Sequence, residues 1–244
     1  MSTLPSPPEP IVDEAIRVVV CDDQGGMRAA FRVILESAGI VVVGEAADGD
    51  IAVAVVRRER PHVVLMDVRM PGRDGISATT QIVAEMPRSR VLALTTFDDD
   101  DVVFGSLAAG ASGFILKNSS PEDVVRAVRL VAGGDAVLDP TVAARVFARF
   151  SLLAAPLTAA EWSELRLLTE RELDVLWLIA HGMTNTEIAD RLGIGDATVK
   201  THVARILSKL AVRDRVHAAI SAHRCGFAIT TRTLGRAPLG RTPP

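Results

Sequence analysis

Five short apolar runs, separated by stretches of helical periodicity, occupy the first half of this 244-residue chain. An apolar run that is continuous rather than alternating is typical of a strand buried on both faces, and the helices between such strands cover the sheet. The runs predict strands at 18–21, 40–43, 63–66, 91–94 and 114–116. The stretches between and after them predict helices at 26–38, 49–59, 74–86, 98–109 and 121–132. The pattern therefore predicts an α/β domain with a five-stranded, doubly wound parallel sheet.

Carboxylates follow two of these strands at the edge where a parallel sheet binds its ligands. Asp22 and Asp23 come directly after the first strand, and Asp67 follows the third. Carboxylates at neighbouring strand ends repel one another unless a cation neutralises them, and Mg²⁺ prefers hard oxygen ligands. We therefore predict a Mg²⁺ site at Asp22, Asp23, Asp67 and the main-chain carbonyl of Arg69, in which Asp23 and Asp67 bind the ion directly and Asp22 binds it through water.

Asp67 is also a candidate nucleophile. Lys117 follows the fifth strand, where its ammonium and the cation together would neutralise a phosphoryl group arriving at Asp67. Phosphatases of the haloacid dehalogenase type use a similar Asp, but they commonly need a second Asp two residues later. Arg69 occupies that position, which argues against a phosphatase.

These residues resemble the receiver domain of bacterial two-component response regulators over about residues 15–134. The resemblance rests on residues at four strand ends, namely Asp22, Asp23, Asp67 within LMDVRMPGRDG, Thr95 and Lys117. It implies a flavodoxin-like fold and phosphorylation of Asp67 by a sensor histidine kinase with Mg²⁺. It further implies that Thr95 is the switch hydroxyl and that Phe114, three residues before Lys117, is the switch aromatic.

From Leu168 the periodicity is helical up to the tail. Capping boxes, in which a Thr is followed three residues later by a Glu, start helices after Thr169 and Thr184. A turn containing two glycines, at 193–195, precedes a third helix at about 197–210, whose predicted inward face carries Val199, Val203, Ile206 and Leu210. Two short helices joined by such a turn indicate a helix-turn-helix.

The segment LTERELDVLWLIAHGMTNTEIADRLGIGDATVKTHVARILSKLAVRDR is similar to the LuxR-type DNA-binding domain over about residues 164–226. With a receiver, this all-α four-helix domain is typical of the NarL/FixJ subfamily of response regulators. The resemblance places Lys200, Thr201 and Ala204 at base-facing positions, and phosphate contacts are predicted for Thr184, Asn185 and Arg205. A fourth helix, 212–223, is predicted to present Val216, Ala219 and Ile220 as a dimer surface.

The remaining segments complete the predicted organisation. Residues 1–14 are interpreted as a flexible N-terminus, 135–163 as a helical linker and 227–244 as a disordered tail. The N-terminus lacks the pattern of a signal peptide and no apolar run has the length of a membrane span, so the protein is predicted to be cytoplasmic, without a membrane partner.

The predicted function is that of a response regulator transcription factor, not an enzyme beyond the receiver's own phosphorylation and dephosphorylation. Its predicted partners are a sensor histidine kinase, promoter DNA and a second copy of the chain, with RNA polymerase as a further candidate. The alternative is a phosphorylation-independent DNA-binding regulator whose first domain is a pseudo-receiver that binds a partner.

Overall fold

The computed structural model describes residues 15–95, 100–135, 137, 149 and 165–229. The predicted N-terminal segment, most of the linker, the tail beyond residue 229 and residues 98–99 of the fourth predicted helix lie outside the described residues. The chain divides into two compact units at Asp139 and Pro140, and each is described by itself.

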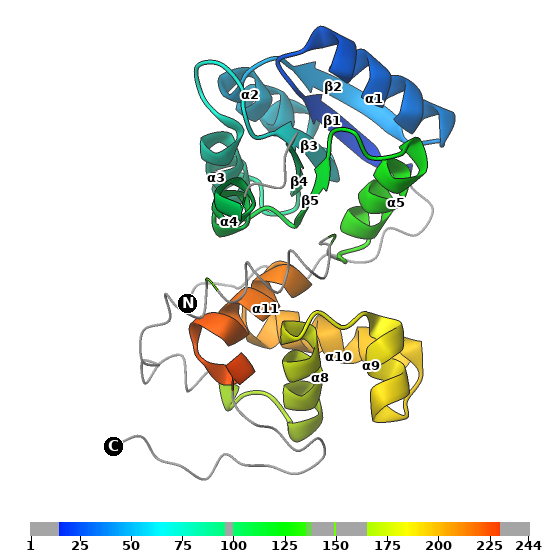
Figure 1. Cartoon of the computed structure of the whole chain (residues 1–244), viewed down its shortest axis with the longest axis vertical. Coiled ribbons are helices and arrows are strands. Elements are labelled where there is room, and N and C mark those ends of the chain that lie inside the picture. Colours follow the sequence, from blue (N-terminus) through cyan, green and yellow to red (C-terminus); the bar gives the residue numbers. More distant parts are fainter. Residues whose placement is uncertain (1–14, 96–99, 136, 138–148, 150–164, 230–244) are drawn as a thin grey trace. The chain divides into compact units, whose positions relative to one another are not determined.

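The first unit contains a five-stranded parallel sheet with strand order β2-β1-β3-β4-β5 (Figure 1). The strands are β1 (Arg17–Cys21), β2 (Val41–Ala46), β3 (Val63–Asp67), β4 (Arg90–Thr95) and β5 (Gly113–Leu116). All four strand pairs are parallel, so the carboxyl ends of the strands lie at one edge. This topology confirms the predicted doubly wound α/β fold.

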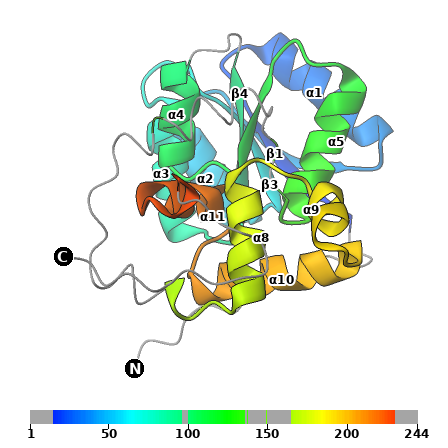
Figure 2. The same cartoon turned by 60° about the horizontal axis from the view of Figure 1, so that its bottom comes forward.

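Helices cover both faces of the sheet. Alternate strand residues point to opposite sides, and because apolar strand residues lie on both sides, both faces need a covering layer. The helices are α1 (Gly25–Ser37), α2 (Gly49–Glu59), α3 (Gly75–Glu85), α4 (Asp100–Ala108) and α5 (Pro121–Ala132). Val18, Val20 and Leu65 form one core with α1 and α5. Val19 and Val64 form the second core with α2 and α3. Figure 2 shows α1 and α5 on one side of the sheet and α2, α3 and α4 on the other.

Side-chain caps start three of these helices. The side chains of Asp48, Asp74 and Ser120 accept hydrogen bonds from main-chain N–H groups in the first turns of α2, α3 and α5. Such caps satisfy donors that an α-helix leaves unpaired at its N-terminus. The punctuation predicted around Ser120, with Pro121 at the first helical position, is thereby confirmed.

The sheet unit extends beyond the predicted boundary at residue 134. Val137 forms an isolated parallel bridge with Gly113, and its carbonyl accepts a hydrogen bond from the Phe114 N–H at 3.0 Å. The beginning of the predicted helical linker is therefore part of the α/β unit, because pairing with β5 satisfies its main-chain groups.

The second unit is helical in its described part. It contains α8 (Glu170–Ala180), α9 (Asn185–Leu192), α10 (Asp196–Lys209), α11 (Arg215–Arg224) and a 3₁₀ helix η1 (Phe227–Ile229). Both predicted capping boxes are present, at Thr169 and Thr184. Gly193 ends α9 in the left-handed conformation with φ 63°, which glycine adopts without strain.

Two predictions for this unit are wrong. Val216, Ala219 and Ile220 are 2%, 2% and 7% exposed, so they belong to the core and do not form a dimer surface. Their helix, α11, begins only at Arg215, after the N-cap Asp214, and packs on α8. The predicted tail also starts too early, because Phe227 and Ala228 are buried in η1.

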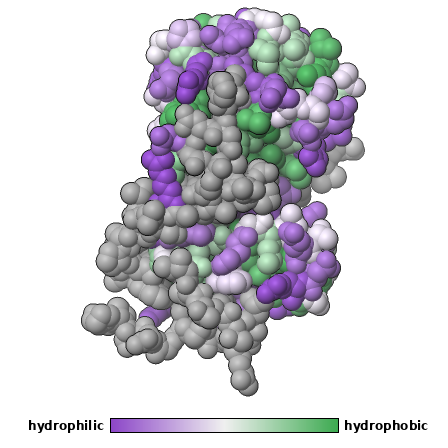
Figure 3. Space-filling view, in the orientation of Figure 1, coloured by the Kyte–Doolittle hydropathy of each residue, from purple (hydrophilic) through white to green (hydrophobic). Residues whose placement is uncertain are grey.

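The exposed surface is mixed in character. Hydrophilic residues predominate on the face drawn in Figure 3, with smaller hydrophobic areas between them. Among the helices of the described residues, none is long and apolar enough to cross a membrane.

Candidate functional site

The three predicted carboxylates lie together at the carboxyl edge of the sheet. Cys21 of β1 is paired with Met66 of β3, so the two strands end at the same level and place Asp22 beside Asp67. Asp22, Asp23 and Asp67 each offer an oxygen, and these oxygens lie within 4.8 Å of one another. Asp22 is fully buried and Asp67 is 3% exposed, whereas Asp23 faces solvent. The cluster therefore combines two buried carboxylates with one accessible carboxylate.

Lys117 joins the two buried carboxylates from the end of β5. Its Nζ lies 2.7 Å from Asp22 Oδ2 and 2.8 Å from Asp67 Oδ2. The Lys117 side chain is only 8% exposed, so this ion pair is shielded from water. One ammonium cannot balance three carboxylates, and the cluster of four groups keeps a formal charge of −2. The two buried carboxylates exceed the one buried ammonium and the third carboxylate lies at the surface beside them, a charge distribution that favours the binding of a divalent cation.

Hydrogen bonds orient the carboxylates. Asp67 Oδ1 accepts a hydrogen bond from the Arg69 N–H at 3.1 Å, and Asp22 Oδ1 accepts one from the Gln24 N–H at 2.9 Å. Burial raises the pKa of Asp67 above its usual value, although the bonds from Lys117 and Arg69 oppose this shift. Burial acts to lower the pKa of Lys117, but its bonds with Asp22 and Asp67 outweigh that effect and raise it. Lys117 is therefore held as a cation.

The loop after β3 depends on Gly75. An ideal Cβ at this position would lie 1.9 Å from the Asp67 carbonyl oxygen, so only glycine fits against the main chain of Asp67. The Gly75 N–H donates to the Val68 carbonyl at 3.0 Å, which closes the loop. The final glycine of LMDVRMPGRDG thus brings the start of α3 into direct contact with the strand end that carries Asp67.

Thr95 and Phe114 lie on the two strands beyond Asp67. In the sheet register Leu94 is the partner of Asp67, so Thr95 lies one residue further toward the carboxyl edge. Thr95 and Phe114 are each 7% exposed, and Thr95 is paired with Leu116 of β5. The loop that follows Thr95, residues 96–99, lies outside the described residues.

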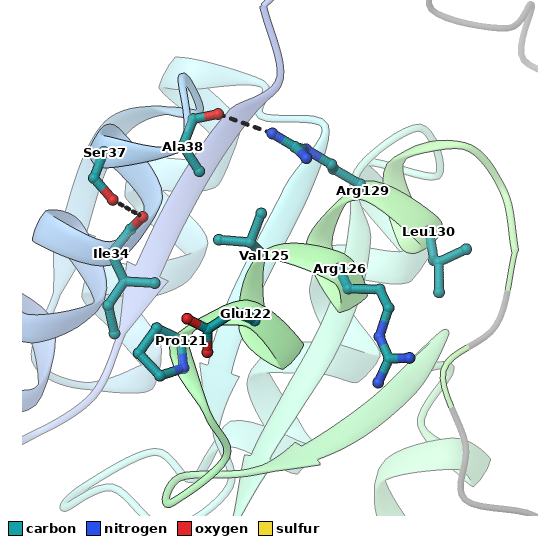
Figure 4. Close-up of a pocket in the computed structure, with 9 residues that line it drawn as sticks. All are labelled: Ile34, Ser37, Ala38, Pro121, Glu122, Val125, Arg126, Arg129 and Leu130. Atoms are coloured by element: carbon teal, nitrogen blue, oxygen red, sulfur yellow. Dashed lines mark hydrogen bonds between the residues drawn. The ribbon is translucent and has the colours of Figure 1, made fainter.

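A separate pocket lies between α1 and α5 (Figure 4). Its lining comprises nine residues, namely Ile34, Ser37, Ala38, Pro121, Glu122, Val125, Arg126, Arg129 and Leu130. Arg129 crosses it and donates to the Ala38 carbonyl at 3.0 Å. This lining includes none of the predicted site residues.

In the helical unit, α9 and α10 form a helix-turn-helix in which α10 is the second helix. Val199, Val203, Ile206 and Leu210 are buried, as predicted. The predicted DNA-facing side chains of α10 are all exposed, namely Lys200, Thr201, Ala204 and Arg205. The periodicity of α10 thus separates a core face from a face that is open to a ligand.

Several of these residues already have local partners. The Thr184 hydroxyl donates to Glu187 Oε2 at 2.9 Å within its capping box, and Asn185 Oδ1 accepts from Arg215 at 3.0 Å. Lys200 lies 3.8 Å from Asp196, and Thr201 donates to the Ala197 carbonyl at 3.0 Å. The Asn185 amide N–H groups and the Lys200 ammonium are still suited to phosphate or base acceptors.

Two arginines that the sequence did not indicate contribute to these sites. Arg28 of α1 donates to the Asp22 carbonyl at 2.7 Å. Arg215 of α11 donates to Asn185 and to the Met183 carbonyl, and so fixes the start of α9. Both arginines bond groups outside their own helices, so the periodicity within each helix does not predict these contacts.

The fold and the two sites define a two-domain chain, with an acidic cluster at the carboxyl edge of a doubly wound sheet and a helix-turn-helix in the second unit. Comparison with known proteins agrees: residues 18–129 match the family described as response regulator receiver domain, and residues 166–222 match bacterial regulatory proteins, luxR family. The chain belongs to the two-component response regulators of the NarL/FixJ subfamily and is a response regulator transcription factor.

The matches to two similar regulators cover nearly the whole length of those regulators. Transcriptional regulatory protein LiaR of Bacillus subtilis (strain 168) is 41% identical over 210 residues, which cover 86% of this chain and 97% of LiaR. Response regulator protein VraR of Staphylococcus aureus (strain Mu3 / ATCC 700698) is 41% identical over 208 residues, which cover 85% of this chain and 96% of VraR. A crystal structure of a LuxR-family two-component response regulator from Aurantimonas sp. SI85-9A1 has a TM-score of 0.52 and 31% identity, covering 56% of this chain and 98% of that chain.

Proposed function

We propose that Asp67 accepts a phosphoryl group from a sensor histidine kinase and that this event controls the binding of promoter DNA by α9 and α10. The observation that carries the proposal is the buried Lys117 ammonium between Asp22 and Asp67, at 2.7 and 2.8 Å, in a cluster that keeps a net negative charge. Purely structural ion pairs do not need an additional carboxylate. This cluster has one, at Asp23, which faces solvent.

In the proposed step an Asp67 carboxylate oxygen attacks the phosphorus of a phosphohistidine. The new O–P bond forms as the N–P bond to the kinase breaks, which leaves an acyl phosphate on Asp67 and returns the imidazole to the kinase. Burial keeps water away from the attacking oxygen. Lys117 then neutralises phosphoryl oxygens in place of its present contact with Asp67. This receiver chemistry is the only catalysis proposed for the chain.

The residues present fit a Mg²⁺ ion. Asp22, Asp23, Asp67 and the main-chain carbonyl of Arg69 would hold it, since Mg²⁺ takes oxygen ligands and is commonly bound by one or two carboxylates together with phosphate and water. Bound there, the ion would supply charge neutralisation for the transferring phosphoryl group.

The response of the receiver is proposed to run through Thr95 and Phe114. The Thr95 hydroxyl lies on the strand next to Asp67, one residue beyond its sheet partner, where it can donate to a phosphoryl oxygen. Phe114 lies on the following strand, so a displacement of Thr95 changes the space available to its ring. Phosphorylation would bias an equilibrium between two receiver conformations.

The proposed DNA contacts come from one face of the helix-turn-helix. Lys200, Thr201 and Ala204 would face bases in the major groove, while Thr184, Asn185 and Arg205 would contact phosphates. Two copies of the chain, each reading one half-site, would form the active species. RNA polymerase is a further proposed partner at the promoter.

Phosphotransfer separates this proposal from a pseudo-receiver. Incubation with labelled acetyl phosphate and Mg²⁺ should label the wild-type chain, and Asp67→Asn should carry no label. Asp50→Asn is the matched control, because Asp50 is an exposed carboxylate of the same domain. Equal labelling of wild type and Asp67→Asn would refute Asp67 as the acceptor. A wild type without label would favour the pseudo-receiver.

The DNA proposal is tested with genomic fragments enriched by the wild-type chain. Lys200→Ala should weaken binding about 5- to 100-fold and reduce the dependence of the affinity on salt, as expected for a lost phosphate or base contact. Arg166→Ala is the control, because Arg166 is an exposed cation outside α9 and α10. Equal losses in both variants would place the DNA on another surface.

A further inference from the structure

Arg28 contacts the loop that carries two of the three clustered carboxylates. Its Nη1 donates to the main-chain carbonyls of Asp22 at 2.7 Å and of Asp23 at 3.3 Å. Arg28 lies in the second turn of α1, so its side chain reaches back over the start of its own helix. One guanidinium group therefore restrains two consecutive peptide units, and each of them carries a predicted metal ligand.

Asp22 has further restraints, since its N–H donates to the Ala46 carbonyl at 3.1 Å and its carboxylate bonds Lys117 and the Gln24 N–H, but the residues that follow Asp23 have fewer. The N-cap residue Gln24 makes no side-chain capping hydrogen bond, and the first two residues of α1 are Gly25 and Gly26. A Cβ at Gly26 would meet no atom within 4 Å, and a Cβ at Gly25 would meet only the Arg28 guanidinium, at 3.5 Å. Glycine has the largest conformational freedom of any residue, so a contact from Arg28 adds order where the start of α1 supplies little, next to Asp23.

Glu45 at the end of β2 holds Arg28 in place. Arg28 Nε lies 3.3 Å from Glu45 Oε2, while the other carboxylate oxygen of Glu45 is bonded to Arg32 at 2.7 Å. The side chains of Arg28 and Glu45 are 21% and 31% exposed, so both are partly shielded from water. The guanidinium is fixed on one side by β2 and on the other by the two carbonyls, which a planar fork of donors can satisfy together.

We propose that Arg28 is a positioning residue for the cation site: by fixing the main chain of Asp22 and Asp23, it raises the affinity of the receiver for Mg²⁺. This inference rests on the proposed Mg²⁺ site. Charge alone predicts the opposite effect, because a cation near a metal site repels the metal. Loss of Arg28 therefore strengthens Mg²⁺ binding if the residue acts only through its charge, and weakens binding if it acts by positioning.

The test is the Mg²⁺ affinity of the full chain, measured as the Mg²⁺-dependent rise in the thermal unfolding midpoint of the receiver, followed by circular dichroism. Arg28→Ala and Arg28→Lys should raise the Kd for Mg²⁺ about tenfold, the lower end of the range for residues that orient metal ligands. Lysine keeps the charge but offers no fork of donors. Glu45→Gln should weaken binding in the same direction, by about threefold or more, because it removes the ion pair that holds Arg28.

Arg32→Ala is the matched control, since Arg32 also pairs with Glu45, and its other bonds are to Glu36 and to the Val42 carbonyl rather than to the loop of Asp22 and Asp23. Its Kd should stay within about twofold of wild type, well below the effect of a residue that orients a ligand. At saturating Mg²⁺, Arg28→Lys should accept label from acetyl phosphate at the wild-type rate, whereas at low Mg²⁺ it should be slower.

The outcomes separate the two proposals. Unchanged or tighter Mg²⁺ binding by Arg28→Lys and Arg28→Ala, with wild type binding normally, overturns the role of Arg28 and leaves the metal site intact. A wild-type chain that gains no stability from Mg²⁺ overturns the metal site and the role of Arg28 together. If Arg28→Ala does not fold, Arg28→Lys and Glu45→Gln decide the question.

Discussion

Replacement of Gly75 by alanine should destabilise the receiver strongly, because the added methyl group meets main chain rather than a flexible side chain. The ideal Cβ lies 1.9 Å from the Asp67 carbonyl oxygen, 2.9 Å from its carbonyl carbon and 3.0 Å from Val68 Cα. Normal contact requires a separation of about 3.4 Å, so the strand end and the start of α3 must move apart by about 1.5 Å.

The cost follows from two terms. Overpacking in a dense core costs about 1–3 kcal/mol, and the hydrogen bond from Gly75 to Val68 contributes about 1 kcal/mol, so Gly75→Ala should lower the free energy of unfolding by about 2–4 kcal/mol. Gly26→Ala is the matched control, since its Cβ meets no atom within 4 Å. That change in α1 should stabilise the receiver by about 0.5 kcal/mol.

Urea unfolding resolves the two effects. Both tryptophans of the chain, Trp162 and Trp177, lie outside residues 15–134 of the sequence, and Trp177 belongs to α8 of the helical unit. Tryptophan fluorescence therefore does not follow the receiver, and circular dichroism is needed for it. Gly75→Ala should shift the receiver transition to lower urea and leave the fluorescence transition of Trp177 in place. The chain should also accept less label, because the main chain of Asp67 is displaced. Equal stability of Gly75→Ala and Gly26→Ala would refute the close contact beneath Asp67.

Three further predictions concern ionisable groups. Burial acts to raise the pKa of Glu172, but hydrogen bonds from Lys209, at 2.6 Å, and from Thr169 outweigh it and lower the pKa, so the stabilisation is present above about pH 4.3 and is lost as the pH falls through the folded pKa. Glu172→Gln should therefore lower the free energy of urea unfolding by about 1–2 kcal/mol at pH 7 and by less at pH 4, and a pH-independent difference would contradict the ion pair. Burial lowers the pKa of His223, so its neutral form is favoured in the folded state and the helical unit should lose stability as the pH falls below about 6.5. The thermal unfolding midpoint of His223→Gln should depend less on pH than that of wild type, and an equal pH dependence in both would argue against a buried neutral imidazole. Burial and the neighbouring Asp22 carboxylate raise the pKa of the fully buried Cys21 thiol, so iodoacetamide at pH 8 should leave Cys21 unmodified in the native chain and modify it in urea. Mass spectrometry of the Cys21 peptide measures this, and modification of the native chain would contradict the prediction.

Local sequence patterns predicted the five strands and the helices α1 to α5 and α8 to α11 in kind, because periodicity and caps act within one element, but they missed the 3₁₀ helix η1 at Phe227–Ile229. The continuous apolar runs lie in the sheet, and the predicted caps at Ser120, Thr169 and Thr184 are present. Residues at strand ends were also predictable, since parallel strands bring their carboxyl ends to one edge. This rule alone was enough to bring Asp22 and Asp67 together.

Contacts between elements needed the tertiary structure. The helical face of Val216, Ala219 and Ile220 has the same sequence pattern whether it packs on α8 or on a second copy, and only the fold assigns it to the core. The pairing of Val137 with β5 depends likewise on where the chain returns after α5.

The amino-acid sequence by itself determined the two domains, their fold classes and the acidic cluster at the strand ends, because these depend on short-range patterns and on a general rule of sheet topology. Only the tertiary structure decided how the cluster is held: Lys117 between two buried carboxylates, Gly75 against the Asp67 carbonyl and Arg28 on the carbonyls of Asp22 and Asp23. The physical reason is that a main-chain carbonyl has the same chemistry at every position. Packing therefore decides which main-chain carbonyl an arginine or a glycine contacts, and the identity of the residue that carries the carbonyl does not.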